Sequence, residues 1–486
     1  MKISKYIIGF FNIFFIILFL VIFKNSFEFN IENILKITAF SIILCGIFFC
    51  IKKIPEKHYT TLVICIFVGI IALQFFYIFL YASIPGFDLG KIYEAVEDSI
   101  IKDKKLEKYE YFNIFPNNAF LGLILKIIFE IMNLFGNDNY FIGGILFNVI
   151  IVNISILLMY KIVSKILNKS CAVFSLFMVL VTIPLHIYTV FFYTDTLSMI
   201  FPLIILYLYI KYVNIEQNKK SRYILMSIIG IVAGIGFYMK STVLLIVIAI
   251  VLYELFCKHL KNVKYISVLI ISLILMLFVF NKLLYIFNVI NERQIERKSF
   301  PYSYWVLVGL NYQGSMDNMD DLKSVKAIEG KEAKSEYIKD RIEYKINYAM
   351  EKNILFDKIK YNIKKTWGDS TYFVYVKTAG ETVNNDVRRN VYVNSGIKDK
   401  IDNFMDIRHF TMLLLMIISA FAINKKEDSF LIIKITIIGL ALFLMIFECR
   451  SRYLVNYIPF FLILETYSVN LIYSNILKIR DKCLKK

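Results

Sequence analysis

The chain contains neither a nucleotide-binding signature nor a cysteine framework. It has no GxxxxGKS/T phosphate loop and no GxGxxG fingerprint, so the glycine-rich phosphate cradles of nucleotide enzymes are missing. Its seven cysteines show no paired spacing, which argues against a disulfide scaffold and a zinc site. We find no internal repeat and no low-complexity tract. These absences argue against a nucleotide-binding enzyme, a disulfide-stabilised secreted domain and a repeat protein.

Long apolar runs make up most of the sequence. Hydrophobic residues account for 58% of the 486 positions, and the mean hydropathy is +0.63, well above a typical globular domain. Only α-helices satisfy their own backbone in lipid at such hydropathy. The first run, Tyr6–Phe23, has a basic start and no small-residue cleavage site after it, so we expect a retained span. The sequence predicts an all-α polytopic membrane protein.

We expect about twelve transmembrane helices and one helix that lies along the membrane surface. The surface helix is expected at 117–136, because Lys126 and Glu130 are four residues apart and share one helix face. The transmembrane helices are expected at 6–23, 35–51, 60–83, 140–160, 170–190, 196–212, 222–238, 241–256, 262–289, 408–424, 429–447 and 453–474.

The basic residues predict the topology. The net charge is +18 and the pI about 9.3. Lysines that flank membrane spans explain this charge without a nucleic-acid partner. If Met1 lies inside and 117–136 does not cross, every inside loop is lysine-rich, as in "KKIPEKH", "NIEQNKKSR" and "KIRDKCLKK". Richness in Ile, Lys, Asn and Phe indicates AT-biased coding and a bacterial source. We therefore predict a multi-pass protein of the bacterial plasma membrane with both termini in the cytoplasm.

Two long segments then face outward. The first, 84–139, contains the surface helix. The second, 290–407, is dense in charge, holds both tryptophans, and is long enough for a small folded domain. We predict a transmembrane domain at 1–289 with a catalytic outer loop at 84–139. An extracytoplasmic soluble domain at 290–407 and C-terminal transmembrane helices at 408–486 would follow.

Charged residues from four separate places are expected to meet at the outer face. Asp88 follows the span 60–83, Asp195 follows 170–190 in "FFYTDTLSM", and Lys240 occupies a tight turn in "FYMKST". The stretch "ECRSRYLVNYIPF" adds Glu448, Arg450, Arg452 and Tyr453. This convergence makes the outer face the candidate functional site. We expect Asp195 to line the same outward cavity as Asp88 there, close enough to share an acceptor or a bound ion.

Each of these residues also has a simpler structural explanation. Asp88 and Asp195 both fit the first turn of a following helix, where aspartate caps the end and complements the dipole. The arginines fit as residues that extend from span ends to the interface. Basic residues in short outer loops run against the topological charge bias, however, and we favour a functional role for the two arginines and the lysine. His186 in "IPLHIYTVF" fits a satisfied core histidine better than an acid–base group.

Together these side chains predict group transfer at the membrane surface. An outer-leaflet carboxylate can accept a proton from a hydroxyl as that hydroxyl attacks. Cations beside it can hold a phosphate leaving group. Such a site suits a donor whose tail lies in the lipid, a polyprenyl-phosphate-linked sugar. Tyr193 would supply a sugar-stacking surface or a hydroxyl.

The chain also resembles the GT-C superfamily of multi-spanning glycosyltransferases. The resemblance is to the bacterial branch similar to protein O-mannosyltransferases and aminoarabinose transferases, glycosyltransferase family 39. It rests on "GFDLGKIYEAV", "YFNIFPNNAFLGLIL", "FFYTDTLSM" and "FECRSRYLVNYIPF", and it covers most of the chain in layout. It implies a polyprenyl-phosphate sugar donor and transfer at the outer face. By position, Asp88 would be the general base. Asp195 would assist the base, orient the acceptor or bind a divalent metal. We assign no certain cofactor and no metal-ligand set.

The chain departs from the family pattern, and other functions stay open. Members commonly carry paired prolines where this chain has Pro116-Asn117-Asn118, and a second acid where it has Leu89. Two extra spans precede the outer loop. The sugar and the acceptor, a glycan or a protein, are therefore undetermined. One alternative is a transporter or flippase of lipid-linked saccharide, which predicts mid-membrane charges and broken helices in inverted repeats. Others are an envelope polysaccharide polymerase or ligase, and a non-catalytic envelope assembly protein.

Overall fold

The regular structure is entirely helical in the part of the chain that the structure describes. In this computed structural model, the described residues are 2–83, 85–215, 218–258, 262–311, 319–377, 384–393, 395–421 and 428–483. Within these ranges the chain forms helices and no β-strand. The prediction of an all-α polytopic fold is therefore confirmed.

Eleven helices of the described residues are long and apolar enough to cross a membrane, or twelve if one bent pair counts as a single span. The number agrees with the prediction of about twelve, but it includes α6, which was predicted to lie along the membrane surface. The long helices are α1 (Lys2–Ser26), α2 (Ile31–Lys53), α3 (Tyr59–Tyr81), α6 (Ala119–Leu134), α7 (Tyr140–Ile166), α11 (Ile200–Asn214), α12 (Lys219–Met239), α14 (Val263–Ile286), α22 (Ile397–Ile418), α23 (Asp428–Ile446) and α24 (Ile458–Cys483). The expected span 241–256 is a shorter apolar helix, formed by η5 (Ser241–Val243) and α13 (Leu244–Cys257).

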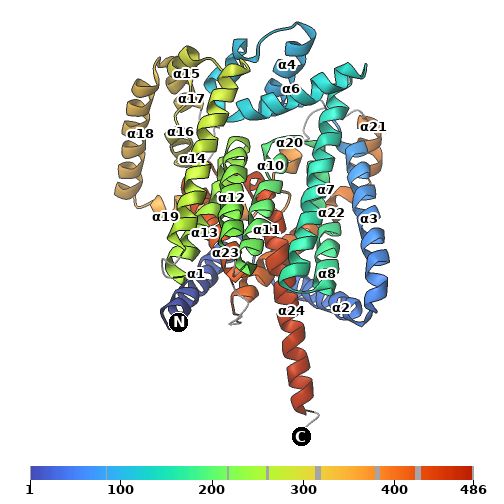
Figure 1. Ribbon diagram of the computed structural model, residues 1–486. Helices are drawn as coiled ribbons and strands as arrows, with labels where there is room; N and C mark the ends of the chain where they lie inside the picture. The colour runs from blue at the N-terminus through green and yellow to red at the C-terminus, as the bar shows by residue number, and fades with distance from the viewer. Residues whose placement is uncertain are drawn as a thin grey trace.

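α6 lies across one end of the bundle. The helix α3 ends and α7 begins at this same end, so the intervening α4 (Phe87–Ile101), α5 (Glu110–Ile114) and α6 stay there (Figure 1). One face of α6 is buried through Leu121, Leu125 and Phe129. Two other residues of this helix, Ile131 and Leu134, are exposed. A helix with this division suits the membrane surface, as the shared face of Lys126 and Glu130 predicts. We call this end of the molecule the α4–α6 end.

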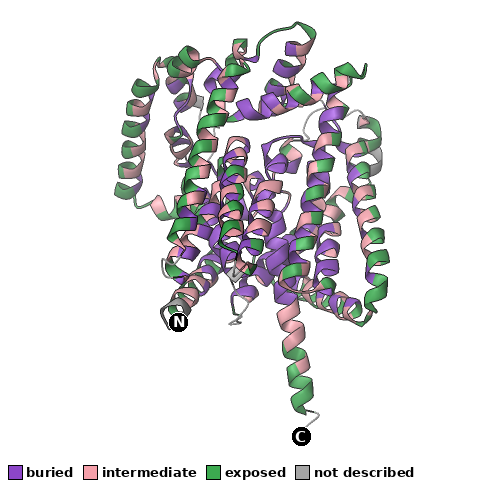
Figure 2. Cartoon of the chain, in the orientation of Figure 1, coloured by how far each residue is buried: buried purple, intermediate pink, exposed green. Residues whose placement is uncertain are grey.

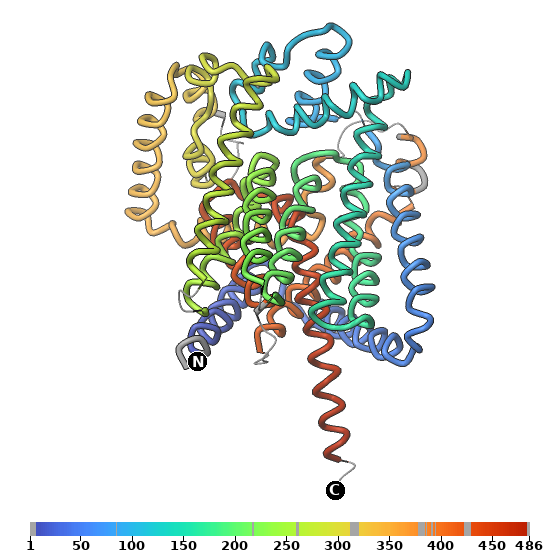
Figure 3. Tube along the Cα trace, viewed as in Figure 1, coloured from blue at the N-terminus to red at the C-terminus, as the bar shows by residue number. Residues whose placement is uncertain are grey.

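Both termini lie at the opposite end of the bundle (Figures 1 and 3). Three of the connections predicted to be cytoplasmic join α2 to α3, α7 to α8 (Lys169–Leu180) and α11 to α12. All three lie at this terminal end in Figure 1. The relative sidedness of the loops thus agrees with the prediction from lysine content. Which end faces the cytoplasm stays a prediction.

Two glycines of α12 allow this helix to approach α14 closely. A Cβ atom added to Gly230 of α12 would overlap the carbonyl oxygen of Leu269 in α14, and one added to Gly234 would lie 2.6 Å from Cβ of Met276. Association of helices in lipid depends on such close packing because lipid tails are as apolar as the side chains. Burial is concentrated in the middle of the bundle, around α8 and α22 to α24, while α3 and α14 keep exposed sides (Figure 2).

The expected span 170–190 is broken. It consists of α8 (Lys169–Leu180), α9 (Ile183–Ile187) and η4 (Tyr188–Val190), with a bend of 70°. Backbone carbonyl groups outside regular helix need partners that lipid cannot supply. Where the segment ends, the buried amide of Asn148 on α7 donates hydrogen bonds of 2.9–3.0 Å to the carbonyls of Tyr188, Thr189 and Phe191. This anchored turn leads directly into α10 (Thr194–Leu197), which carries Asp195.

The described part of the segment 290–407 packs in two places. Three of its helices, α16 (Ser303–Gly309), α17 (Met319–Ala327) and α18 (Lys331–Glu351), share a small hydrophobic cluster that includes Phe300, Tyr304 and Ile338. The preceding helix α15 (Glu292–Lys298) packs Ile295 against a second cluster, which contains residues of α4 and α6. By contrast, α19 (Leu355–Trp367) contacts α1 and α23, and Trp367 at its end is buried in the core of the bundle. The packing therefore differs from the single soluble domain predicted for this segment, because its later part contributes to the membrane bundle. Three short helices complete the segment: α20 (Val374–Lys377), α21 (Asn385–Val387) and η6 (Arg388–Val393).

Candidate functional site

A cavity of about 430 Å³ opens at the α4–α6 end of the bundle. This volume falls within the usual range for a small-molecule site. Among the described residues that line the cavity, Asp88 is the only carboxylate, and Lys240, Lys331 and Arg452 are the cations. Most of the remaining wall is aromatic or apolar. The aromatic wall consists of Tyr111, Phe115, Tyr193, Phe237, Tyr238, Tyr285, Tyr302, Trp305, Phe443, Phe447 and Tyr453.

Asp88 reaches the cavity from the first turn of α4. The preceding residue, Phe87, has φ of +52°, a left-handed conformation that costs a non-glycine residue about 1–2 kcal/mol. Gly86 is the N-cap, and no side chain caps this helix by a hydrogen bond. Asp88 Oδ2 lies 3.5 Å from the Tyr193 hydroxyl, at the outer limit of a hydrogen bond. The carboxylate therefore complements the helix dipole without acting as a hydrogen-bonded cap, and its oxygens face the cavity.

Two polar side chains, those of Asn118 and Tyr193, line the cavity together with the Asp88 carboxylate. Asn118, in η3 (Pro116–Asn118), donates a hydrogen bond of 2.7 Å from its amide to the Tyr111 hydroxyl. The Asn118 amide oxygen lies 3.5 Å from the Tyr193 hydroxyl. Asn118 and Tyr193 are both buried. Amide and phenol groups held in this way can orient a polyhydroxyl ligand beside Asp88.

Asp195 is not exposed at the surface and does not line the large cavity. Its side chain is 2% exposed and accepts an ion-paired hydrogen bond of 2.5 Å from Nζ of Lys240. Nη1 of Arg452 lies 3.9 Å from its second oxygen. The N-cap of α10 is Tyr193, with no side-chain cap hydrogen bond. The capping explanation for Asp195 is therefore wrong, and so is the expectation that it shares the wall of the Asp88 cavity. The cause is the short helix α10, which turns the carboxylate inward toward the two cations.

The three predicted cations fall into two groups: Lys240 and Arg452 line the cavity, and Arg450 does not. Arg452 is 8% exposed. Its Nε and Nη1 atoms are buried and make no hydrogen bond to a described residue. Buried donors without a partner are costly, and an anion in the cavity would satisfy them.

Glu448 and Arg450 are paired with each other and are absent from the described lining of the cavity. Nε of Arg450 lies 3.1 Å from Glu448 Oε1, and the guanidinium lies over the ring of Phe373. The Tyr453 hydroxyl donates a hydrogen bond to the other Glu448 oxygen. Tyr453 itself lines the cavity. The structure thus brings together Asp88, Tyr193, Lys240, Arg452 and Tyr453, while the Glu448–Arg450 pair supports the wall from behind.

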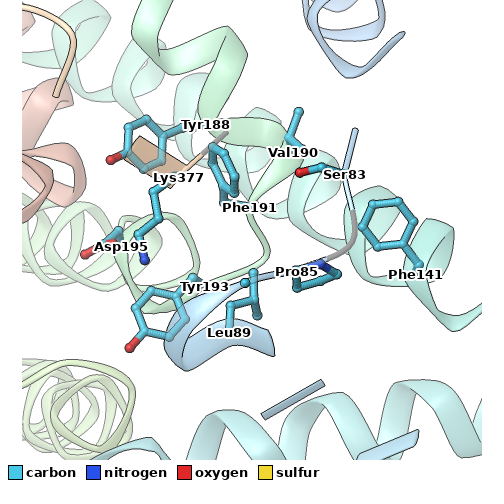
Figure 4. A pocket seen from close by; sticks show the side chains of 11 residues that line it. Ser83, Pro85, Leu89, Phe141, Tyr188, Val190, Phe191, Tyr193, Asp195 and Lys377 are labelled. Carbon is cyan, nitrogen blue, oxygen red and sulfur yellow. The ribbon is translucent and has the colours of Figure 1, made fainter. Parts of the chain in front are cut away.

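A narrow pocket adjoins the cavity, and Tyr193 belongs to both walls. Figure 4 shows Asp195 and Lys377 on one side of this pocket, with Tyr193 beneath them. Nζ of Lys377 lies 5.2 Å from the centre of the Tyr193 ring. Burial, together with the positive charge of the nearby Arg452, lowers the pKa of Lys377 to about 7. This lysine was not predicted as a site residue.

The comparison with known proteins concerns almost the whole chain. Residues 3–472 match the model of a family described as conserved hypothetical integral membrane protein. The chain belongs to this family. No curated protein and no solved structure matches it.

Sequence reasoning missed three polar residues in this integral membrane protein. Asn118 and Tyr111 lie within or beside the stretch "YFNIFPNNAF", which was singled out without assigning roles to them. The only sequence signal for Lys377 is its place at the end of the aromatic run "TYFVYV". Among the described residues there is no group of three or more His, Cys, Asp or Glu side chains arranged to hold a metal ion. His186, expected to be a core residue, is fully buried, with Nε2 3.1 Å from the Leu180 carbonyl oxygen.

Proposed function

We propose that this integral membrane protein is a glycosyltransferase of the GT-C type, acting on a polyprenyl-phosphate-linked sugar at the outer face of the membrane. The observation that carries the proposal is a cavity with one carboxylate, Asp88, and the two cations Lys240 and Arg452 in the same wall. A glycosyl transfer needs a base for the acceptor and positive charge for the leaving phosphate. The resemblance to GT-C enzymes supports the same assignment.

In the proposed reaction, an acceptor hydroxyl attacks the anomeric carbon of the donor sugar. The new bond joins the acceptor oxygen to that carbon, and the bond between the carbon and the phosphate oxygen breaks. The hydroxyl proton passes to the Asp88 carboxylate. The electron pair of the broken bond leaves on the phosphate, where Lys240 and Arg452 stabilise the negative charge. No further reactant is required.

The walls of the cavity suit the two ends of such a donor. Tyr302, Trp305 and Tyr238 offer aromatic faces against which a sugar ring can stack. Phe237, Phe443 and Phe447 offer apolar surface for the first units of a lipid tail. The cavity therefore combines a polar site with apolar contacts in one continuous space.

Asp195 has a positioning role in this proposal. A carboxylate paired with both Lys240 and Arg452 holds the two cations at a defined separation. It also offsets part of their mutual repulsion when no phosphate is bound. This role replaces the direct part in chemistry that the resemblance implies for the second acidic residue.

The test is a transfer assay in liposomes with a panel of polyprenyl-phosphate sugars, comparing wild type with Asp88→Asn. We expect turnover to fall by a factor of about 10²–10⁴, the usual effect of losing a general base. Asp98→Asn is the matched control, because Asp98 lies on the same helix and pairs with Lys102 away from the cavity lining. Turnover of Asp88→Asn at the wild-type level would exclude the assignment of the base.

A transporter of lipid-linked saccharide is the second candidate, and two observations favour it. The span from α8 to η4 is bent by 70°. Within the bundle, both guanidinium Nη atoms of Arg408 bind the Glu465 carboxylate at 2.8 Å, and both side chains are buried. Neither member of this pair is among the described residues that line the cavity. Movement of a fluorescent lipid-linked sugar between leaflets, unaffected by Asp88→Asn, would favour transport over transfer.

A further inference from the structure

Lys377 carries a charge that no described carboxylate neutralises by direct contact. Its ammonium group lies over two aromatic rings, 5.2 Å from the centre of Tyr193 and 5.6 Å from that of Phe87. It forms no salt bridge with a described residue. Cations over aromatic rings gain about 0.5–2 kcal/mol, less than the hydration that they lose when buried. The side chain is therefore held in a position that its own contacts explain only in part.

The backbone before Lys377 is held in an unfavourable conformation. Tyr372 and Phe373 have φ of +54° and +66°. Such residues persist only where the surroundings impose the conformation, at about 1–3 kcal/mol each. Here Asp369 accepts hydrogen bonds from the backbone amides of Thr371 and Phe373, at 3.0 and 2.8 Å. The Tyr372 hydroxyl also bonds to His409 at 3.0 Å.

The same aspartate ties this segment to the turn that supplies Arg452. The Ser451 hydroxyl donates a hydrogen bond of 2.5 Å to the second oxygen of Asp369. Phe373 lies beneath the guanidinium of Arg450. Lys377 and Arg452 therefore reach the site from two segments, far apart in sequence, that one carboxylate holds together. Both cations also lie over the Tyr193 ring.

The charges that face Lys377 leave an excess of positive charge. Asp88 and Phe87 face it from α4, and Tyr193 and Asp195 from the segment around α10. Arg452 and Arg450 contribute positive charge from the turn before α24. Glu448 already pairs with Arg450, and Asp195 is shared by Lys240 and Arg452. An anion between Lys377, Lys240 and Arg452 would restore the balance and bind the Arg452 N–H groups that have no hydrogen-bond partner among the described residues.

We propose that Lys377 is a third cation of the phosphate site formed by Lys240 and Arg452, and that it reaches the bound phosphate past the ring of Tyr193. This inference rests on the proposed function for the identity of the phosphate, which is that of the lipid-linked donor. The flexible four-carbon stem of a lysine allows the small movement that is needed.

Proton binding to Lys377 makes phosphate affinity depend on pH. Because burial lowers its pKa to about 7, part of the population is neutral at physiological pH. Only the protonated lysine attracts the phosphate. A bound phosphate raises this pKa, so affinity is highest below about pH 7 and falls as the pH rises through that value.

The experiment measures the binding of farnesyl phosphate to the purified full-length protein in detergent micelles, at about pH 6 and about pH 8.5. For Lys377→Met we expect affinity at the lower pH to fall about tenfold, the factor for one lost charge-assisted hydrogen bond. The difference in affinity between Lys377→Met and wild type should shrink at the higher pH. Lys377→Arg should bind farnesyl phosphate at both pH values. Lys352→Met, at the exposed end of α18, is the matched control and should bind as wild type.

Farnesol serves as the uncharged probe. Its binding should not change in Lys377→Met, which separates loss of the phosphate contact from loss of folding. Equal farnesyl phosphate affinity for wild type and Lys377→Met at the lower pH would overturn the inference. So would a wild-type protein that binds farnesol as tightly as farnesyl phosphate. If binding depends on Lys377 but no sugar is transferred, the phosphate site stands and the proposed transferase function fails.

Discussion

Replacing Asp195 by asparagine tests whether this buried carboxylate holds the cation pair. The substitution keeps the shape of the side chain and one acceptor oxygen, but it removes the negative charge between Lys240 and Arg452. The two salt-bridge distances are 2.5 and 3.9 Å, and the Asp195 side chain is 2% exposed. The variant therefore leaves two buried cations with no carboxylate between them.

The magnitude follows from the geometry. At an effective dielectric constant of about 20, the Coulomb attraction is about 7 kcal/mol for Lys240 and about 4 kcal/mol for Arg452. Relaxation and water entry reduce the net effect, and breaking a buried pair typically costs about 3–5 kcal/mol. We expect Asp195→Asn to lower the stability of the protein by about this amount. If Asp195 were merely a helix cap, asparagine would replace it with almost no loss.

Thermal unfolding in detergent micelles, followed by tryptophan fluorescence, measures the effect because Trp367 is buried in the core. A double-mutant cycle with Lys240→Met isolates the pair. Removing both charges should cost less than the sum of the single changes, by about 1–3 kcal/mol. Asp98→Asn, a change at a partly exposed position, controls for the loss of an acidic residue elsewhere. An unchanged melting temperature for Asp195→Asn, or strict additivity in the cycle, would refute the positioning role.

Two further predictions concern the bundle and its topology. Gly230→Ala should destabilise the protein by about 1–3 kcal/mol, because the new methyl group overlaps the Leu269 carbonyl oxygen. Gly46→Ala, where a Cβ meets nothing within 4 Å, should be neutral or stabilising by up to about 1 kcal/mol in the same melting assay. Cysteines introduced at Lys219 and Glu332 in a cysteine-free background should be labelled from opposite sides in intact cells, with position 219 cytoplasmic. Labelling of both from one side would contradict the predicted topology.

The apolar runs alone determined the fold class and most of the layout. A helix in lipid satisfies its own backbone, so nearly every run of sufficient length forms one helix. The run 170–190 is the exception, because it is bent by 70°. The same local logic placed α6 across the end of the bundle, because two charged residues four positions apart share one face. Lysine-rich loops predicted which connections share an end, since this property depends on chain order and not on packing. Chain order also predicts that Asp88, Lys240 and Arg452 lie at the same end of the bundle, so they could be assigned to one site.

The tertiary structure decided which of these side chains face the cavity. Asp195 and Asp88 both follow a predicted span, yet Asp195 on the short helix α10 is buried against its cations while Asp88 faces the cavity. Lys377 comes close to Tyr193 through tertiary contacts of its segment, among them the hydrogen bond from Ser451 to Asp369. Hydrophobic periodicity determines where a helix runs and at which end it stops. The pairing of charged groups depends on helix rotation and loop paths, where a shift of a few ångströms exchanges one partner for another.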